Sequence, residues 1–213
     1  MSSKLIVPFL SLFFLCGTLV VAHVRLLAPV SRSSMWRNPQ FAPHNPPINY
    51  DDDGLYCGSV PQEEVVTTCG LCGDPFSSPT PRANEHGGRY GRGVIAANYS
   101  AGQLINIGLD FTTAHWGYFE IHVCDGLPES EACFLENRLV FQHGSSKFPV
   151  SGNGGSQTIQ TTAQLPSNLR CEHCILRMNY RAGNSWGDCH NGTEGMGCGR
   201  QETFRHCADI SIL

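Results

Sequence analysis

The chain has 213 residues, with 14 basic and 18 acidic side chains and a formal net charge of −4. A mildly acidic chain is a poor binder of nucleic acid and lacks the basic patch that anionic membranes attract, so we expect neither partner. The length fits one sizeable domain.

The first 22 residues have the features of a secretory signal peptide. Lys4 supplies a positive charge, residues 5–21 are largely apolar, and Val20 and Ala22 are the small residues required at positions −3 and −1 of the cleavage site. The apolar stretch is shorter than the ~20 residues of a membrane span. We therefore predict a secreted chain, cleaved after Ala22, whose single domain covers residues 23–213. Its 191 residues hold 13 basic and 18 acidic side chains, and its first residue is His23.

Ten of the eleven cysteines lie beyond this cleavage site. An even number in a secreted chain indicates disulfides, here five, but the sequence does not give their pairing. Two Cys-x-x-Cys motifs, at 69–72 and 171–174, could instead bind zinc or take part in thiol redox chemistry. They lie about a hundred residues apart, outside zinc-ribbon spacing, so we interpret each cysteine as half of a structural disulfide. Sequons at Asn98 and Asn191 predict N-glycosylation.

The first third of the predicted mature chain is irregular. Residues 23–60 are rich in proline and asparagine, which excludes a long helix there. The acidic run at 51–53 lacks the spacing of an EF-hand, so we interpret it as a solvated loop rather than a calcium site. Residues 74–93 contain three prolines and two consecutive glycines, and we expect a long loop.

From residue 94 onward, apolar side chains recur at every second position, which predicts half-buried strands. The alternation covers 105–111, 119–123, 176–180 and 210–212, and the glycines within 152–155 predict a turn between strands. Short strands, turn-rich connections and many disulfides predict an all-β fold. We expect an antiparallel β-sandwich of the immunoglobulin or fibronectin III kind, with long loops and about five disulfides.

The chemistry of His23 depends on processing. A histidine at a free N-terminus can chelate a metal through its imidazole and its amine, because an amine with a pKa near ~8 deprotonates readily onto a metal. Such a site needs one more nitrogen ligand. His115 lies between two predicted strands, where a side chain can reach the mature N-terminus. We interpret His122 as facing solvent from a strand, and His173 and His206 as loop or surface groups.

The sequence contains no motif that indicates a hydrolase. The sequence lacks His-Glu-x-x-His, Gly-x-Ser-x-Gly and a P-loop. Paired carboxylates for glycoside hydrolysis could come from Glu120, Glu129, Glu131 or Glu202, but no spacing selects a pair.

Several sequence blocks resemble a known family when they are taken together and in order. They are His23 with 25–37, 45–52, 55–58, 69–74, 81–85, 87–90 and 197–210. The blocks span nearly the whole predicted mature chain, and they look like the lytic polysaccharide monooxygenases of auxiliary activity family 15.

This resemblance implies a copper site called a histidine brace. Its ligands would be the amine and imidazole of His23 and the imidazole of His115, a nitrogen set that suits Cu(II) and can hold Cu(I). Phe204 matches the axial position, where other members carry Tyr, and its ring cannot coordinate. Glu202 is a candidate carboxylate beside the copper that could position an oxygen species or accept its proton. Thr113 departs from the family pattern, which usually has Ala there, and could change the polarity beside the open copper position.

The implied reaction is oxidative cleavage of insoluble β-1,4-linked polysaccharide, with chitin as the first expected substrate and cellulose as the second. An external electron donor reduces the copper, O2 or H2O2 serves as co-substrate, and a C–H bond at C1 or C4 is hydroxylated. Two alternatives stay open: a chitin- or cellulose-binding protein without catalysis, and a copper-binding protein. We expect a monomer. Aromatic residues that could lie on a sugar-binding face are Trp36, Tyr50, Tyr90, Trp116 and Trp186.

Overall fold

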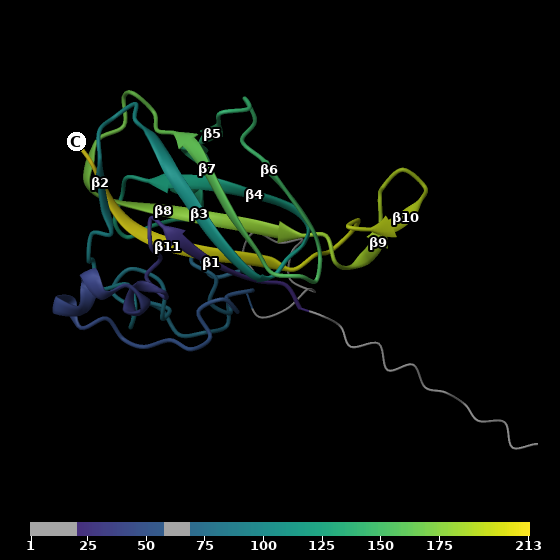
Figure 1. The fold of residues 1–213 in the computed structure, drawn as a ribbon, viewed down its shortest axis with the longest axis horizontal. Coiled ribbons are helices and arrows are strands. Elements are labelled where there is room, and N and C mark those ends of the chain that lie inside the picture. Colours follow the sequence, from purple (N-terminus) through teal and green to yellow (C-terminus); the bar gives the residue numbers. More distant parts are fainter. Residues whose placement is uncertain (1–20, 58–68) are drawn as a thin grey trace, which may run out of the picture.

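The computed structural model describes residues 21–57 and 69–213, and these form a sandwich of two β-sheets (Figure 1). The first sheet has the strand order β1 (His23–Ala28), β3 (Leu104–Thr113), β7 (Gln157–Gln164) and β5 (Val140–Phe141). The second has the order β2 (Ala97–Tyr99), β11 (Thr203–Ile212), β8 (Cys171–Ala182), β4 (His115–Cys124) and β6 (Phe148–Asn153). A separate hairpin of β9 (Trp186–Asp188) and β10 (Glu194–Met196) projects from one end.

The predicted antiparallel sandwich is confirmed, with one exception at an edge. Neighbouring strands of both sheets run antiparallel, except that β2 pairs with β11 in parallel. The helices are short: η1 (Met35–Arg37), η2 (Pro39–His44) and α1 (Glu131–Glu136). The α1 helix has no counterpart in the sequence prediction; the hydroxyl of Ser130 caps it by accepting a hydrogen bond from the Cys133 backbone N–H at 3.2 Å. Among the described residues, no helix is long and apolar enough to span a membrane.

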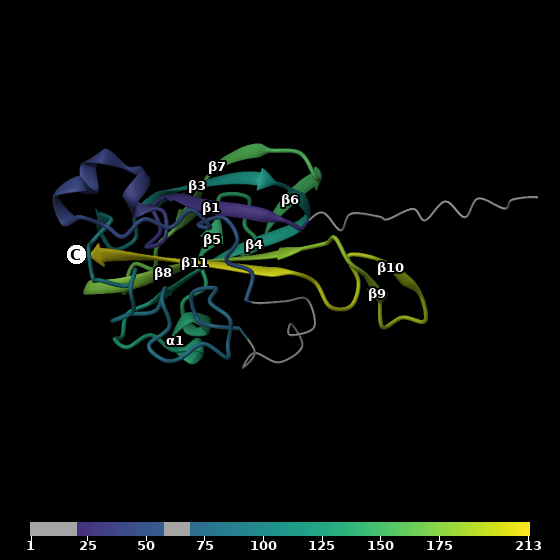
Figure 2. The ribbon, with the colours of Figure 1, turned by 90° about the horizontal axis from the view of Figure 1, so that it is seen from below.

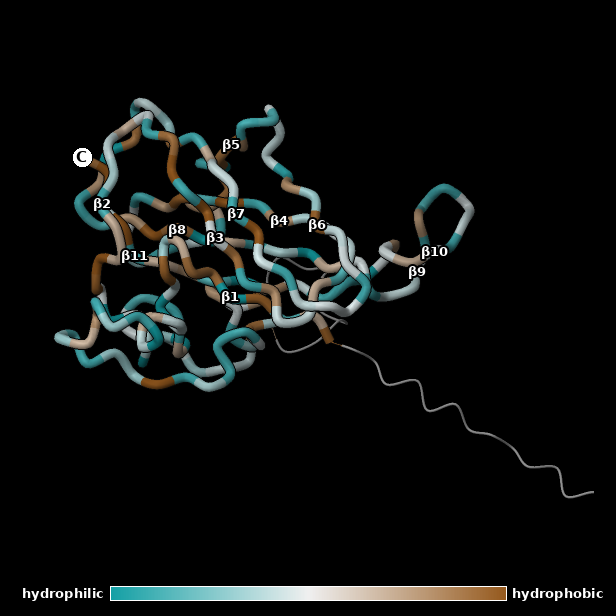
Figure 3. The backbone as a smooth tube through the Cα atoms, viewed as in Figure 1, coloured by the Kyte–Doolittle hydropathy of each residue, from teal (hydrophilic) through white to brown (hydrophobic). Residues whose placement is uncertain are grey.

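The core lies between the two sheets and follows the predicted alternation. Ile107 and Leu109 face it from β3, Ile121 from β4, and Met178 from β8, all fully buried. Hydropathy mapped on the backbone shows hydrophobic positions recurring along these strands, whereas the tip of the β9–β10 hairpin is hydrophilic (Figure 3). Removing this apolar surface from water is the main stabilisation of such a sandwich.

The outer face of the five-stranded sheet is covered by a third layer of loops together with α1 (Figure 2). Alternate residues of β11 point to opposite faces, so Phe204 and Ala208 enter the sandwich core, whereas Cys207 and Asp209 point into this outer layer. The disulfide between Cys72 and Cys207 ties the layer to the sheet. All ten cysteines beyond residue 22 are paired, as predicted, and the other disulfides are Cys57–Cys69, Cys124–Cys133, Cys171–Cys174 and Cys189–Cys198.

The surface assignment of two histidines is wrong. His122 is 2% exposed, because the outer layer covers the face of β4 that points away from the core. His206 is fully buried in β11, on the same side as Phe204. Burial and the adjacent charges of Arg177 and Arg138 lower the pKa of His122 to about 3, and Arg177 donates a hydrogen bond to its Nδ1 at 3.3 Å.

This buried histidine predicts acid sensitivity. Between pH 6.5 and about 3, the unfolded chain binds a proton at His122 that the folded chain excludes, so the free energy of unfolding should fall as the pH is lowered. The free energy of unfolding should depend less steeply on pH in His122→Gln, with a slope smaller by up to ~1.4 kcal/mol per pH unit. Urea unfolding at several pH values measures it. The exposed histidine variant His143→Gln should behave as wild type, and a His122→Gln slope equal to that of wild type would contradict the prediction.

Candidate metal centre

His115 is positioned by a tight crossing between the two sheets. β3 ends two residues before it, and β4, which belongs to the other sheet, begins with it. Ala114 makes the crossing and is buried. Its N–H donates to the carbonyl of Gly155 at 2.8 Å, and its carbonyl accepts from the N–H of Gly154 at 2.8 Å. The predicted glycine turn at 152–155 therefore holds the start of β4 in place.

His23 begins β1 at the same end of the sandwich. In the pairing of β1 with β3 it lies opposite Thr113, two residues before His115. The register shifts between His23 and Val24, so the pairing is irregular where the strand starts. Figure 1 shows the start of β1, the end of β3 and the start of β4 together, at the end from which the β9–β10 hairpin projects. The two predicted ligands therefore come from adjoining strand ends.

Tyr180 holds the backbone of His115 from inside the core. Its hydroxyl donates to the His115 carbonyl at 2.7 Å and accepts from the His115 N–H at 3.3 Å. Its ring meets Phe111 edge-on, with centroids 5.1 Å apart. Burial raises the pKa of Tyr180, so the hydroxyl stays protonated and able to donate. The alternation of apolar residues predicted that Tyr180 faces the core, but it did not predict the contact with His115. A buried tyrosine hydroxyl needs a hydrogen-bond partner, and this need is the signal that could have suggested the contact.

The imidazole nitrogens of the two predicted ligands differ in their present partners. Nε2 of His115 is buried and has no hydrogen-bond partner among the residues that the structure describes. Buried polar atoms usually have partners, so an unpaired nitrogen suits a ligand. Nδ1 of His23 lies 3.1 Å from the carbonyl of Val21, which precedes the predicted cleavage site. An all-nitrogen donor set of this kind fits copper.

Glu202 and Phe204 contact the residues around the two predicted histidine ligands. Oε2 of Glu202 accepts from the N–H of Ala22 at 3.0 Å and from Nδ2 of Asn184 at 2.6 Å. Phe204 is fully buried, and its ring centroid lies 5.9 Å from that of Tyr180. Glu202 is thus next to the residue that precedes His23, and Phe204 packs on the tyrosine that holds His115. Sequence reasoning missed Asn184, whose partner Glu202 is 18 residues away along the chain.

An ion-pair cluster anchors β1 just beyond His23. Arg25 pairs with Asp52 at 2.8 Å, Asp53 at 2.9 Å and Asp110 at 3.2 Å, and Asp52 also accepts from Arg37 at 2.6 Å. The interpretation of the acidic run as a solvated loop is therefore wrong for Asp52, which is fully buried. Burial alone raises the pKa of Asp52, but the hydrogen bonds from Arg37 and Arg25 lower it overall, so the carboxylate stays ionised.

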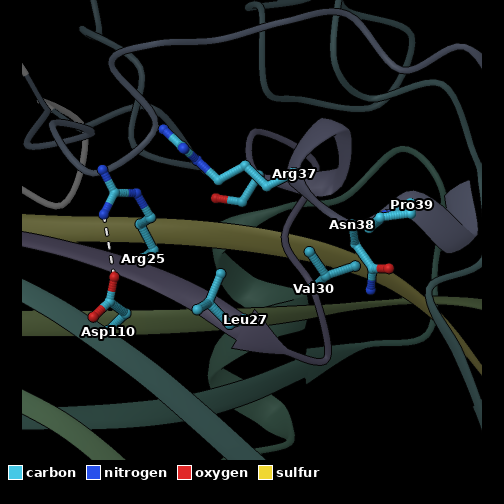
Figure 4. A pocket seen from close by; sticks show the side chains of 8 residues that line it. Arg25, Leu27, Val30, Arg37, Asn38, Pro39 and Asp110 are labelled. Carbon is cyan, nitrogen blue, oxygen red and sulfur yellow. Dashed lines mark hydrogen bonds and ion pairs between the residues drawn. The ribbon is translucent and has the colours of Figure 1, made fainter. Parts of the chain in front are cut away.

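The cluster borders a pocket of about 380 Å³, in which Arg25 and Asp110 face each other (Figure 4). Leu27, Val30 and Arg37 also line it, and none of the four predicted site residues does. The pocket is therefore distinct from the histidine pair.

Comparison with known proteins identifies the family. Residues 23–210 match the family described as lytic polysaccharide mono-oxygenase, cellulose-degrading. The chain belongs to this family. A solved structure of a lytic polysaccharide monooxygenase AA15 from Thermobia domestica, in the Cu(I) state, is 41% identical, with 89% of this chain and 98% of that chain covered and a TM-score of 0.81. The resemblance to auxiliary activity family 15 is thereby confirmed.

More distant solved structures have lower sequence identity and lower TM-scores with this chain. An AA10 lytic polysaccharide monooxygenase from Streptomyces lividans is 16% identical, covers 89% of this chain and 99% of its own, and has a TM-score of 0.49. A chitin binding domain from Burkholderia pseudomallei is 11% identical, covers 91% and 100%, and has a TM-score of 0.49. Both are too remote to inform the site. A search among curated proteins finds no match. As a lytic polysaccharide monooxygenase, the protein is a copper-dependent enzyme that cleaves polysaccharide oxidatively.

Tyr180→Phe tests the support of His115 in this monooxygenase. The variant keeps the ring but leaves the part-buried backbone N–H and carbonyl of His115 without their Tyr180 partner, so the free energy of unfolding should fall by about 1–3 kcal/mol. Copper affinity should fall ~10–100-fold, the usual cost of losing a group that orients a ligand. Denaturant unfolding and copper titration measure the two effects. Tyr118→Phe, in the strand that contains His115, is the control. A stability loss with unchanged copper affinity would limit Tyr180 to a role in the fold.

Proposed function

We propose that the protein is a secreted lytic polysaccharide monooxygenase whose mature form is a single domain beginning at His23. Its proposed substrates are chitin first and cellulose second. The main support is the strand pairing that sets His23 opposite Thr113, two residues before His115, together with the Nε2 of His115, which is buried and unpaired among the described residues. The family match begins at residue 23, which supports cleavage after Ala22.

In the proposed site, the amine and imidazole of His23 and the imidazole of His115 would hold one copper ion. When bound, copper supplies one-electron redox chemistry with O2 or H2O2 after reduction by an external donor. Tyr180 fixes the backbone that carries His115, which keeps this imidazole in place. The buried ring of Phe204 offers no ligand atom and excludes water from its side of the site.

Removal of residues 1–22 would change several groups at once. It would free Nδ1 of His23 from the carbonyl of Val21 and would create the N-terminal amine. It would also take the Ala22 N–H away from Glu202, which would keep its hydrogen bond from Asn184. The Glu202 carboxylate would then stand beside the new N-terminus, where it could hold or accept a proton. We infer that cleavage completes the site as well as releasing the chain.

Two exposed indole rings lie on segments that adjoin the start of β4 and suit stacking on a sugar ring. Trp116 follows His115 and is 63% exposed, and Trp186 begins the projecting hairpin and is 64% exposed. The carbonyl of Trp116 accepts a hydrogen bond from the N–H of Gly183, which links the two segments. Of the predicted aromatics, Tyr50 is exposed, but its ring meets that of Trp36 edge-on. We propose Trp116 and Trp186 as the contacts with the polymer.

The reaction is tested with the chain produced with His23 as its first residue and loaded with copper. With ascorbate and crystalline chitin it should release oxidised oligosaccharides, and cellulose should yield fewer; mass spectrometry identifies the products. Without ascorbate, no oxidised products are expected. Products from cellulose alone would reverse the substrate order. Binding to either polymer with no oxidised products would favour a non-catalytic binding protein, and copper binding with no polymer affinity would favour a copper-binding protein.

The ligand set is tested by His115→Ala and by a chain that retains one residue before His23. Loss of a group that only orients a ligand lowers metal affinity ~10–100-fold. Both changes should lower copper affinity by more than this, because each removes a ligand itself. Both should also abolish oxidised products. The exposed His44→Ala variant is the matched control and should keep wild-type affinity. An unchanged copper EPR spectrum in His115→Ala would remove His115 from the site.

A further inference from the structure

A second group of metal-binding side chains lies outside the copper site. Among the described residues, His86, His173 and Asp209 each offer one ligand atom, and these atoms all lie within 4.8 Å of one another. We propose that these three residues bind a second metal ion, a zinc-type divalent cation, independently of the copper. Two imidazoles and one carboxylate are a usual protein ligand set for zinc, with a fourth position left for water.

The three ligands come from segments that are distant in the sequence. Asp209 lies on β11 and points into the outer layer, on the face opposite to Phe204. His173 is on β8, the neighbour of β11, and His86 is in the outer loop layer. Asp209 lies five positions after Phe204 on the strand, which is roughly 17 Å along the sheet. The cluster and the histidine pair therefore cannot share one ion.

His86 is held in place and has a nitrogen to spare. Its backbone N–H donates to Oε1 of Glu129 at 2.8 Å, which fixes the loop over the sheet. Nδ1 of its ring is buried and has no hydrogen-bond partner in the part of the chain that the structure describes. The ring meets that of His173 edge-on, with centroids 5.5 Å apart. A bound cation would give this unpaired nitrogen its partner.

Asp209 is an ionised and oriented carboxylate. Arg32 donates to Oδ1 at 2.6 Å and to Oδ2 at 2.8 Å, and it pairs with Glu129 at 2.8 Å. Burial alone raises the pKa of Asp209, but the hydrogen bonds and charge of Arg32 lower it overall. Carboxylates that bind metals are commonly oriented by such partners. Asp209 and Glu129 together outweigh the single charge of Arg32, so the cluster still favours a cation.

The spacing between the donors needs little adjustment. Nε2 of His173 lies 2.8 Å from Oδ1 of Asp209. Two bonds of ~2.1 Å at a tetrahedral angle place donor atoms roughly 3.4 Å apart, so a zinc ion could replace the shared proton after a shift of about half an ångström. The His173 side chain is 25% exposed, which gives the ion a route from solvent.

The competing explanation is a plain hydrogen-bonded pair of His173 and Asp209. That pair does not need His86, whereas a three-ligand site does. His86 therefore separates the two, and it is a suitable position to change because it is a half-buried loop residue outside the sandwich core.

The test uses the mature chain with one equivalent of copper already bound, so that added metal cannot enter the brace. Equilibrium dialysis against Zn2+ with elemental analysis should give one zinc per chain in addition to the copper. Co2+, used as an optical probe, should give the intense d–d bands of a tetrahedral site. Zinc should also raise the Tm of wild type, because an ion that binds only the folded state stabilises it.

His86→Gln should lose the zinc, the cobalt bands and the Tm shift, while keeping its copper EPR spectrum as evidence of folding. His173→Gln should behave in the same way. His190→Gln, which alters a histidine whose side chain is 79% exposed, should bind zinc as wild type does. Wild type that binds copper alone, or zinc binding that survives in His86→Gln, would overturn the proposal.

Discussion

The position of His23 depends on the pairing of β1 with β3. This short strand carries the first predicted ligand, and its register places His23 against Thr113, two residues from the second ligand. Strand pairing alone allows slippage, but here two further contacts oppose it. The buried side chain of Leu26 enters the core, and Arg25 on the other face is fixed by three carboxylates, including the buried Asp52. A shift by one residue would exchange these faces.

The residues around His23 also explain why proteolytic processing and chemistry are coupled in our proposal. In the uncleaved chain, Val21 is hydrogen-bonded to the His23 imidazole and Ala22 to the Glu202 carboxylate. Other parts of the site do not change with cleavage, because Tyr180 already holds His115 and the turn at 152–155 already holds Ala114. The fold thus positions His115 before cleavage, whereas His23 would gain its amine only when the protease cuts the chain.

β11 links the two proposed metal sites because its alternating side chains serve different layers. Phe204 points into the sandwich near the histidine pair, whereas Asp209 points into the outer layer near His86 and His173. The two sites differ in chemistry accordingly. The first would be an all-nitrogen set at the end of the sandwich where β4 begins, suited to redox copper. The second includes a buried carboxylate within a salt-bridge network, suited to a cation that stabilises structure.

The sequence by itself determined the sandwich, the inward face of each main strand and the number of disulfides, because period-two alternation and cysteine parity are local or compositional signals. The predicted cleavage site suggested His23 as a chelating N-terminus, but the assignment of His115 as its partner in a copper site came from the resemblance to a family. Only the tertiary structure decided which cysteines pair, how Tyr180 acts, and that His122 and Asp52 are buried. Alternation correctly turned His122 away from the core, but it cannot tell whether loops cover that face. Burial of a charged or polar side chain requires partners such as Arg177 or Arg25, which only folding brings into contact.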